Sequence, residues 1–334
     1  MERILVTGGA GYVGSICAAN LIRRGHEVTV IDDLSTGHFE AVPAEAKFYQ
    51  TDIGDERQLS RILKERHVDV VFHFAAKALI AESVTDPAIF YRTNMHSAFV
   101  MAECLRSAGV HRFVFSSTAA VYGNPTTVPI PEDHPKNPVN SYGESKLAFE
   151  QLLRWYARAY GWSAVAFRYF NACGATDTQG ELHQPETHII PLLLQTASGQ
   201  RPEFVVYGTD YETPDGSCLR DYVHVLDIAD AHCLALKLMN QPRFEAYNIG
   251  TGVSYSVLQM CRKVEEITGR KPNLRMGERR PGDPAILCAS PQKIQSQLGW
   301  TPRHSDLHQI VRSAWKWEMS RSSQAHDAPI LAKT

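Results

Sequence analysis

Residues 7–14 read Thr7-Gly8-Gly9-Ala10-Gly11-Tyr12-Val13-Gly14, between a short apolar run, Arg3–Thr7, and a helical pattern, Gly11–Arg24. The spacing of Gly8, Gly11 and Gly14 allows a tight turn, close approach of backbone N–H groups to a pyrophosphate, and close packing of helix on strand. The positive end of the helix favours the anion. This strand–loop–helix predicts a dinucleotide-binding loop that includes Tyr12 and Val13.

Two acidic residues follow the second expected strand, Glu27–Ile31. Asp32 lies 18 residues after Gly14, where a carboxylate accepts a hydrogen bond from the ribose 2′-OH and repels a 2′-phosphate. Asp33 beside it strengthens that repulsion. The predicted cofactor is therefore NAD rather than NADP.

Strand and helix patterns alternate through the first 175 residues. This alternation predicts an α/β fold with a Rossmann-type doubly wound parallel sheet, whose ligand crevice lies at the carboxyl ends of the strands. At two such ends, Asp52-Ile53 and Phe74-Ala75-Ala76 are expected to lie along the dinucleotide. The further strands expected are Ala46–Thr51, Val68–Phe74, Arg112–Phe115 and Ser163–Phe167, and the helices are Asp55–Arg66, Asn94–Ala108 and Ser141–Tyr160.

Beyond residue 175 prolines become frequent and the alternation stops. We predict an NAD-binding domain over residues 1–175 and a smaller α/β substrate-binding domain over residues 176–334. The segment 218–240 could pack back on the first domain, and the tail 321–334 is expected to be mobile. Helices are expected at Thr187–Ser198, Leu226–Met239, Ser256–Thr268 and Ser305–Met319.

The composition excludes several classes of protein. The 334 residues carry a net charge of −2 and are 44% hydrophobic, unlike a disordered chain or a basic nucleic-acid binder. The seven cysteines form no C-x-x-C pair, which favours reduced thiols over disulfides or a zinc ribbon. No apolar run approaches the roughly 18 residues of a membrane span, and no signal peptide begins the chain. We expect a cytoplasmic protein without nucleic-acid or membrane partners, and predict no metal site, since His224 and His232 lack carboxylates at ligand spacing.

A tyrosine and a lysine four residues apart begin the helix expected at Ser141–Tyr160. Tyr142 and Lys146 share one helical face, and a nearby ammonium group favours the phenolate of a tyrosine that acts as a base. The strand before them ends in Ser116-Ser117-Thr118, so that Thr118 can offer a hydroxyl to the same reacting oxygen. We predict that these three residues are catalytic.

The glycine loop, this Ser/Thr strand end and Tyr-x-x-x-Lys, in this order, resemble the extended short-chain dehydrogenase/reductases. The chain is most similar to the UDP-glucose 4-epimerases (UDP-galactose 4-epimerases) among them, over nearly its whole length. The stretches that carry the likeness are Val6–Gly14, Phe72–Ser83, Phe113–Gly123, Ser141–Glu150, Phe167–Gly174, Pro185–Pro191, Gly208–Asp227, Arg279–Asp283 and Leu298–Pro302.

The resemblance implies interconversion of UDP-glucose and UDP-galactose through a 4-keto sugar, with NAD bound throughout. Tyr142 would be the base, Lys146 its electrostatic partner and ribose anchor, and Thr118 the hydroxyl relay. Asn94 and Tyr169 match residues beside the cofactor. A lysine found near the cofactor in some epimerases aligns with Ala78, one position after Lys77.

The resemblance also implies a set of residues for the sugar nucleotide. Arg220 and Arg280 match phosphate-binding residues, and Asp283 matches one that holds the uridine ribose. The smaller Leu287 stands where some members have Tyr, so N-acetylated UDP-hexosamines are expected to fit as well. The remaining substrate-binding residues implied are Asn171, His188, Val205 and Tyr207.

Other functions stay open on sequence alone. A 4-epimerase of another UDP-sugar, a pentose or uronate, has the same motifs. A nucleotide-sugar 4,6-dehydratase would need acidic residues where Ala119-Ala120 follow Thr118, and a non-catalytic NAD-binding scaffold would be expected to lose Tyr142 or Lys146. The family often dimerises through the helices that correspond to Asn94–Ala108 and Ser141–Tyr160, so we expect a homodimer.

Overall fold

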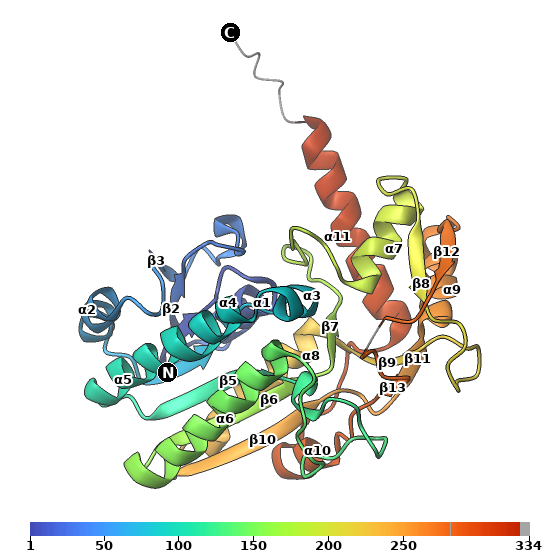
Figure 1. Ribbon diagram of the computed structural model, residues 1–334. Helices are drawn as coiled ribbons and strands as arrows, with labels where there is room; N and C mark the ends of the chain where they lie inside the picture. The colour runs from blue at the N-terminus through green and yellow to red at the C-terminus, as the bar shows by residue number, and fades with distance from the viewer. Residues whose placement is uncertain (281, 328–334) are drawn as a thin grey trace.

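The computed structural model describes residues 1–280 and 282–327 and has two lobes (Figure 1). A seven-stranded sheet forms the first lobe, and every neighbouring pair of its strands is parallel. This confirms the predicted doubly wound α/β fold. In spatial order the strands are β10 (Arg243–Ile249), β6 (Ser163–Tyr169), β5 (Arg112–Thr118), β4 (Val70–His73), β1 (Arg3–Thr7), β2 (Glu27–Asp32) and β3 (Lys47–Gln50).

Helices cover both faces of this sheet. Leu5 points to the face packed by α2 (Glu56–Arg66), α5 (Ala98–Ser107) and α6 (Ser141–Tyr160). Ile4 and Val6 point to the opposite face, packed by α1 (Tyr12–Arg23), α8 (Val225–Ala235) and α10 (Gln292–Leu298). Burial on both faces explains why the strands are nearly continuous apolar runs.

The connection between β4 and β5 differs from the single helix expected at Asn94–Ala108. Two short helices, α3 (Ile80–Thr85) and α4 (Pro87–Tyr91), come first, and a π-helical turn, η2 (Arg92–Ser97), joins α4 to α5. Asn94 lies within this turn. π-helical turns often occur at functional sites, because they redirect a side chain from the regular helical spiral.

The second lobe has its own apolar core among α7 (Ile189–Ser198), α9 (Val257–Thr268) and α11 (Leu307–Asp327). Its strands form two small sheets beside these helices. The strands of the two sheets are β7 (Asn171–Cys173), β8 (Phe204–Tyr207), β9 (Leu219–His224), β11 (Ser254–Ser256), β12 (Leu274–Gly277) and β13 (Ile286–Leu287). The remaining elements of the described chain are the short 3₁₀ turns η1 (Phe39–Ala41), η3 (Ala119–Tyr122) and η4 (Leu236–Leu238).

The second half of the chain also builds the first lobe. Helix α8 packs against α1, and β10 extends the sheet beyond β6 (Figure 1). Helix α11 continues past the expected end at Met319 to Asp327. Of the tail expected to be mobile, residues 321–327 therefore belong to α11, and residues 328–334 lie outside the described residues.

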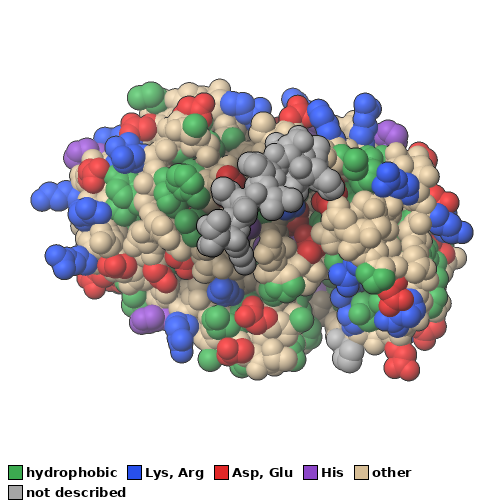
Figure 2. Space-filling view, turned by 90° about the horizontal axis from the view of Figure 1, so that it is seen from above, with side chains coloured by type: hydrophobic (Ala, Val, Ile, Leu, Met, Phe, Trp, Pro, Cys, Tyr) green, Lys and Arg blue, Asp and Glu red, His purple; other side chains and the backbone are tan. Residues whose placement is uncertain are grey.

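The surface carries charges of both signs on both lobes, as the face in Figure 2 shows. This mixture agrees with the net charge of −2. Within residues 1–280 and 282–327, no helix has the length and apolar character that crossing a membrane requires.

Candidate active site

Tyr142, Lys146 and Thr118 meet at the carboxyl end of β5. Thr118 is the last residue of that strand, and its hydroxyl makes a hydrogen bond with Tyr142. Lys146 Nζ donates to the Ser116 carbonyl oxygen at 2.8 Å. Asn140 caps α6, because its side chain accepts from Gly143 N at 2.9 Å, and this fixes the helix turn that carries Tyr142.

Burial dominates the electrostatics of this pair. It raises the pKa of Tyr142, and the hydrogen bond with Thr118 opposes the rise. Burial also lowers the pKa of Lys146 to about 7, although the charge of Glu150 opposes the change. The sequence led us to expect that Lys146 would lower the pKa of Tyr142, whereas in the chain itself burial raises it and Thr118 is the group that opposes the rise. A lysine with a pKa near neutrality can change its proton occupancy at physiological pH.

A buried ion pair lies directly behind these residues. Arg168 donates to both carboxylate oxygens of Glu150, at 3.0 and 2.6 Å, and the two side chains are 1% and 2% exposed. Ser117, next to Thr118, donates to the same carboxylate at 2.5 Å. Glu150 lies one helical turn after Lys146, so this network ties α6 to β5 and β6.

The glycine-rich loop has the shape of an anion cradle. A Cβ on Gly8 would lie 2.4 Å from Ala75 N, and one on Gly14 would lie 2.1 Å from Gly8 O. The first turn of α1, with Tyr12 and Val13, follows the N-cap residue Gly11 and has no side-chain cap. Its backbone N–H groups can therefore bind the pyrophosphate of a dinucleotide.

The acidic residues predicted beside the dinucleotide lie at the ends of β2 and β3. The Asp32 carboxylate is buried and accepts from Ala10 N at 3.0 Å and Leu34 N at 2.9 Å. Burial raises the pKa of Asp32, and the two backbone hydrogen bonds oppose that rise. Asp33 and Asp52 are exposed, whereas Ile53 is buried.

The residues predicted beside the cofactor after β4 lie in a loop that Asn94, in η2, holds in place. Phe74, Ala75 and Ala76 follow β4 and are each partly buried. Asn94 accepts from Lys77 N at 2.9 Å and donates to Lys77 O at 3.0 Å and Ser145 Oγ at 3.1 Å. Asn94 thus holds the loop after β4 against the helix that carries Tyr142.

Tyr169, at the end of β6, is oriented by a buried histidine. His232 Nδ1 lies 2.9 Å from the Ile228 carbonyl oxygen, to which it must donate, so that Nε2 accepts from the Tyr169 hydroxyl at 2.6 Å. Burial lowers the pKa of His232 to about 4. The neutral His232 therefore acts as a fixed acceptor for Tyr169.

The residues predicted for the nucleotide meet in the second lobe. Asp283 accepts from Arg220 at 2.6 Å and from Arg280 at 3.0 Å. The Arg280 guanidinium lies 4.9 Å from the centre of the Tyr207 ring, at the end of β8. Val205 lies on the same strand, and Asn171 donates to Asp221 O at 2.7 Å in the small sheet nearby.

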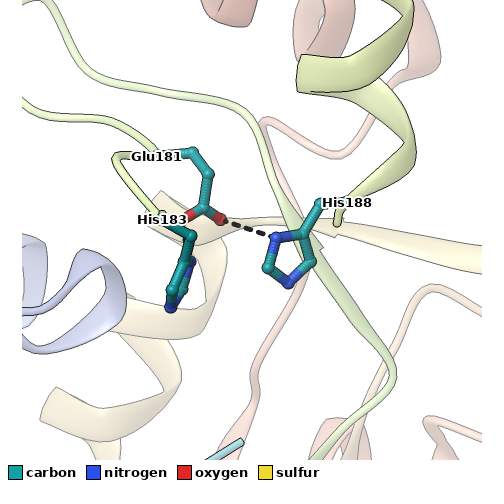
Figure 3. Close-up of side chains that lie close together, drawn as sticks. All are labelled: Glu181, His183 and His188. Carbon is teal, nitrogen blue, oxygen red and sulfur yellow. Dashed lines mark hydrogen bonds and ion pairs between the residues drawn. The ribbon is translucent and has the colours of Figure 1, made fainter. Parts of the chain in front are cut away.

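His188 lies in a cluster that the sequence analysis missed (Figure 3). Its Nδ1 is 2.8 Å from Glu186 Oε1 and 3.5 Å from Glu181 Oε2. Against the effect of burial, Glu186 and Glu181 raise the pKa of His188 to about 8. His183 contacts the other oxygen of Glu181. The spacing Glu-x-His-x-x-x-x-His over residues 181–188 was the available signal.

Comparison with known proteins identifies the family. A model of the NAD dependent epimerase/dehydratase family matches residues 4–250. A UDP-glucose 4-epimerase of Corynebacterium glutamicum is 45% identical over 326 residues, which cover 98% of this chain and 98% of that protein. The chain belongs to the UDP-glucose 4-epimerases of this family.

Solved structures of this family agree in fold over almost the whole chain. The UDP-glucose 4-epimerase of Brucella ovis in complex with NAD is 42% identical with a TM-score of 0.91, covering 94% of this chain and 98% of that one. The UDP-Glc/GlcNAc 4-epimerase of Campylobacter jejuni is 33% identical with a TM-score of 0.84, covering 96% of this chain and 100% of that one.

Proposed function

We propose that this protein interconverts UDP-glucose and UDP-galactose by inverting the configuration at C4, with NAD as its cofactor. The observation that carries the proposal is the group Thr118, Tyr142 and Lys146, placed at the sheet end that also holds the glycine-rich loop. The family membership agrees with this reaction. Ala119 and Ala120, which follow Thr118, cannot transfer the C5 proton that a 4,6-dehydratase must move.

Bound NAD supplies a hydride acceptor and donor for C4. Tyr142 removes the proton of the 4-hydroxyl group, Thr118 donates a hydrogen bond to the reacting oxygen, and Lys146 stabilises the phenolate and anchors the ribose. The 4-keto sugar then turns about its diphosphate linkage and presents its opposite face. Tyr142 would then return the proton to the same oxygen, so that the product is the other epimer with no net oxidation.

Two sets of residues keep the reactants in place. Arg220 and Arg280 would hold the diphosphate, since charged donors bind phosphate oxygens well. Asn171 would contact a substrate phosphate and His188 the nucleotide, and Val205, Tyr207 and Asp283 would hold the uridine. The cofactor-binding residues that we propose are Gly8, Gly11, Tyr12, Val13, Gly14, Asp32, Asp33, Asp52, Ile53, Phe74, Ala75, Ala76, Asn94, Tyr142, Lys146 and Tyr169.

The test is incubation of the purified protein with UDP-galactose without added NAD. We expect UDP-glucose as the product, with no net reduction of NAD. This result separates an epimerase from a dehydrogenase, a dehydratase and a non-catalytic NAD-binding scaffold. Tyr142→Phe should abolish turnover while NAD stays bound. The control Tyr160→Phe changes a 48% exposed tyrosine on the same helix and should retain activity. Full turnover by Tyr142→Phe would refute the assignment.

The packing of Leu287 supports a wider substrate range, which includes N-acetylated UDP-hexosamines. Leu287 packs beside the apolar cluster of Ala119, Val121 and Phe170, next to Thr118. A leucine leaves more room there than a tyrosine, and the relative from Campylobacter is named for both glucose and N-acetylglucosamine forms. Leu287→Tyr should reduce turnover of UDP-N-acetylglucosamine far more than that of UDP-glucose. Equal loss on both substrates would contradict this role.

The paired helices α5 and α6 favour a homodimer. Tyr156 donates to Glu103 across them, and Arg106 lies 5.2 Å from the centre of the Tyr160 ring. Phe99 and Trp155 on their outer surface are 44% and 63% exposed. Trp155→Glu should convert a dimer to a monomer in light scattering, whereas Met276→Glu, on the other lobe and 53% exposed, should not. A monomeric wild type would refute the proposal.

We also propose that the protein works in the cytoplasm. All seven cysteines are free and buried, as suits a reducing compartment. Cell fractionation followed by the epimerase assay tests this location, and activity confined to a membrane or extracellular fraction would contradict it.

A further inference from the structure

The segment between β7 and α7 places two groups that the epimerase reaction does not use beside His188. Glu181, His183 and His188 each place one possible ligand atom within 4.8 Å of the others. Figure 3 shows the Glu181 carboxylate near both imidazole rings, whose centroids are 5.1 Å apart. Glu181 and His183 have no place in the proposed reaction, and our sequence analysis predicted no metal site.

The distances in this cluster are close to those of a metal site. Ligand atoms bound about 2.1 Å from a tetrahedral zinc ion lie about 3.4 Å apart. His188 Nδ1 and Glu181 Oε2 are 3.5 Å apart, while His183 Nδ1 contacts Glu181 Oε1. A small outward rotation of His183 would therefore open a position equally near all three groups.

The charge of the cluster also suits a divalent cation. The Glu181 and Glu186 side chains are each 10% exposed, and among the described residues the basic groups that form ion pairs with them are His183 and His188. A divalent ion bound here would place two positive charges beside two largely buried carboxylates, whose charge is costly to bury without a counterion. The mixed nitrogen and oxygen donors suit zinc and related transition metals better than calcium or magnesium, which prefer oxygen ligands.

The segment itself bridges the cofactor loop and the substrate lobe. The Tyr12 hydroxyl donates to Gly174 O at 2.5 Å, and Gln179 Nε2 donates to Ala41 O at 2.7 Å. At the other end, His188 is the N-cap residue of α7. An ion held by Glu181, His183 and His188 would fix the end of this segment next to α7, while the two hydrogen bonds hold its start.

We propose that Glu181, His183 and His188 bind one divalent transition-metal ion of the zinc class, which holds the segment 174–188 in place at the start of α7. The fourth position is open to solvent, since the His188 side chain is 44% exposed. The ion requires only Nδ1 of His188, so Nε2 can still serve the sugar nucleotide. The site does not depend on the proposed reaction, because it is defined by metal binding alone.

The test uses the full-length holoprotein, stripped with a chelator and titrated with Co²⁺ alone. We expect one Co²⁺ per chain with the visible absorption of a four-coordinate site, displaced by Zn²⁺. Glu181→Gln and His183→Ala should each lose this ion. The control His308→Ala should keep it, because His308 also lies near a carboxylate, Glu266 at 3.8 Å, but outside the cluster.

Circular dichroism and retained NAD show whether each variant is folded. Failure of the wild type to take up Co²⁺, or uptake by Glu181→Gln and His183→Ala equal to that of the wild type, would overturn the site. If one variant does not fold, the other still decides the outcome. An epimerase assay on the same samples shows separately whether the proposed reaction holds.

Discussion

Replacement of Arg168 by Met removes the positive member of the buried ion pair with Glu150. The Glu150 carboxylate is 2% exposed, so it must then remain charged without its partner or take up a proton. Loss of one member of a buried pair costs about 3–5 kcal/mol. Protonation of the carboxylate sets an upper limit to this loss of stability, because keeping a proton at pH 7 on a glutamate of ordinary pKa about 4.3 costs about 3.7 kcal/mol.

This limit makes the cost depend on pH. At pH 5 the same protonation costs about 1 kcal/mol, since only about 0.7 pKa units separate the ordinary value from the pH. Burial without a counterion disfavours a charged carboxylate, so the folded Arg168→Met variant binds more protons than its unfolded chain and gains stability as pH falls. The destabilisation relative to wild type should therefore shrink by about 2–3 kcal/mol between pH 7 and pH 5.

Urea unfolding, followed by circular dichroism at both pH values, measures this difference. The double variant Glu150→Gln/Arg168→Met lacks both members of the ion pair and should show no such pH dependence. Arg112→Met breaks a two-bond pair with Glu2 whose side chains are 24% and 30% exposed, and should cost about 1 kcal/mol or less at either pH. The same destabilisation of Arg168→Met at pH 5 and pH 7 would refute the reasoning.

Three further variants test other contacts of the site. Gly14→Ala places a Cβ 2.1 Å from Gly8 O, so the purified protein should lack NAD by mass spectrometry; normal occupancy would contradict the cradle. Burial lowers the pKa of Lys146 to about 7, so between pH 7 and pH 9 the unfolded chain binds more protons at this lysine than the folded chain does. The stability of the wild type should therefore rise with pH relative to that of Lys146→Met, by up to about 1.4 kcal/mol per pH unit. Urea midpoints of the two proteins that change with pH in parallel would exclude this. His232→Phe removes the acceptor of the Tyr169 hydroxyl and should lower the free energy of unfolding by about 1–3 kcal/mol. The double variant Tyr169→Phe/His232→Phe leaves no unpaired hydroxyl and should lose less. Equal decreases in melting temperature for the single and the double variant would argue against this hydrogen bond.

The first lobe could be predicted from the sequence because its signals are local. Most strands from β1 to β6 are short apolar runs, and helical patterns follow β1, β3, β4 and β5. Tyr142 and Lys146 share one helix. Strand β10 is a different case, since its first three residues, Arg243, Phe244 and Glu245, are only partly buried. Its pairing with β6 depends on a chain reversal after α8 that no local pattern encodes.

The contacts of the second lobe join residues that are far apart in sequence. Arg220 and Asp283 are 63 residues apart, and the resemblance to a family, rather than spacing, suggested both. Strands β7, β11 and β13 have three, three and two residues, too few for an alternating pattern to appear. The Glu181 cluster was missed for another reason, because its residues lie in the loop between β7 and α7, where Glu-x-His-x-x-x-x-His follows neither a strand nor a helix period.

The two lobes meet different physical requirements, and this explains their different construction. Proton and hydride transfer at C4 need groups fixed relative to one another, and Thr118 and Tyr142 lie on a buried strand and a capped helix supported by the Glu150–Arg168 pair. The sugar must instead turn while its nucleotide stays bound, so phosphate contacts can be placed on loops and short strands. Arg280 has a 59% exposed side chain, yet it shares Asp283 with the nearly buried Arg220. One carboxylate thus holds near each other the two guanidinium groups that we propose for the diphosphate.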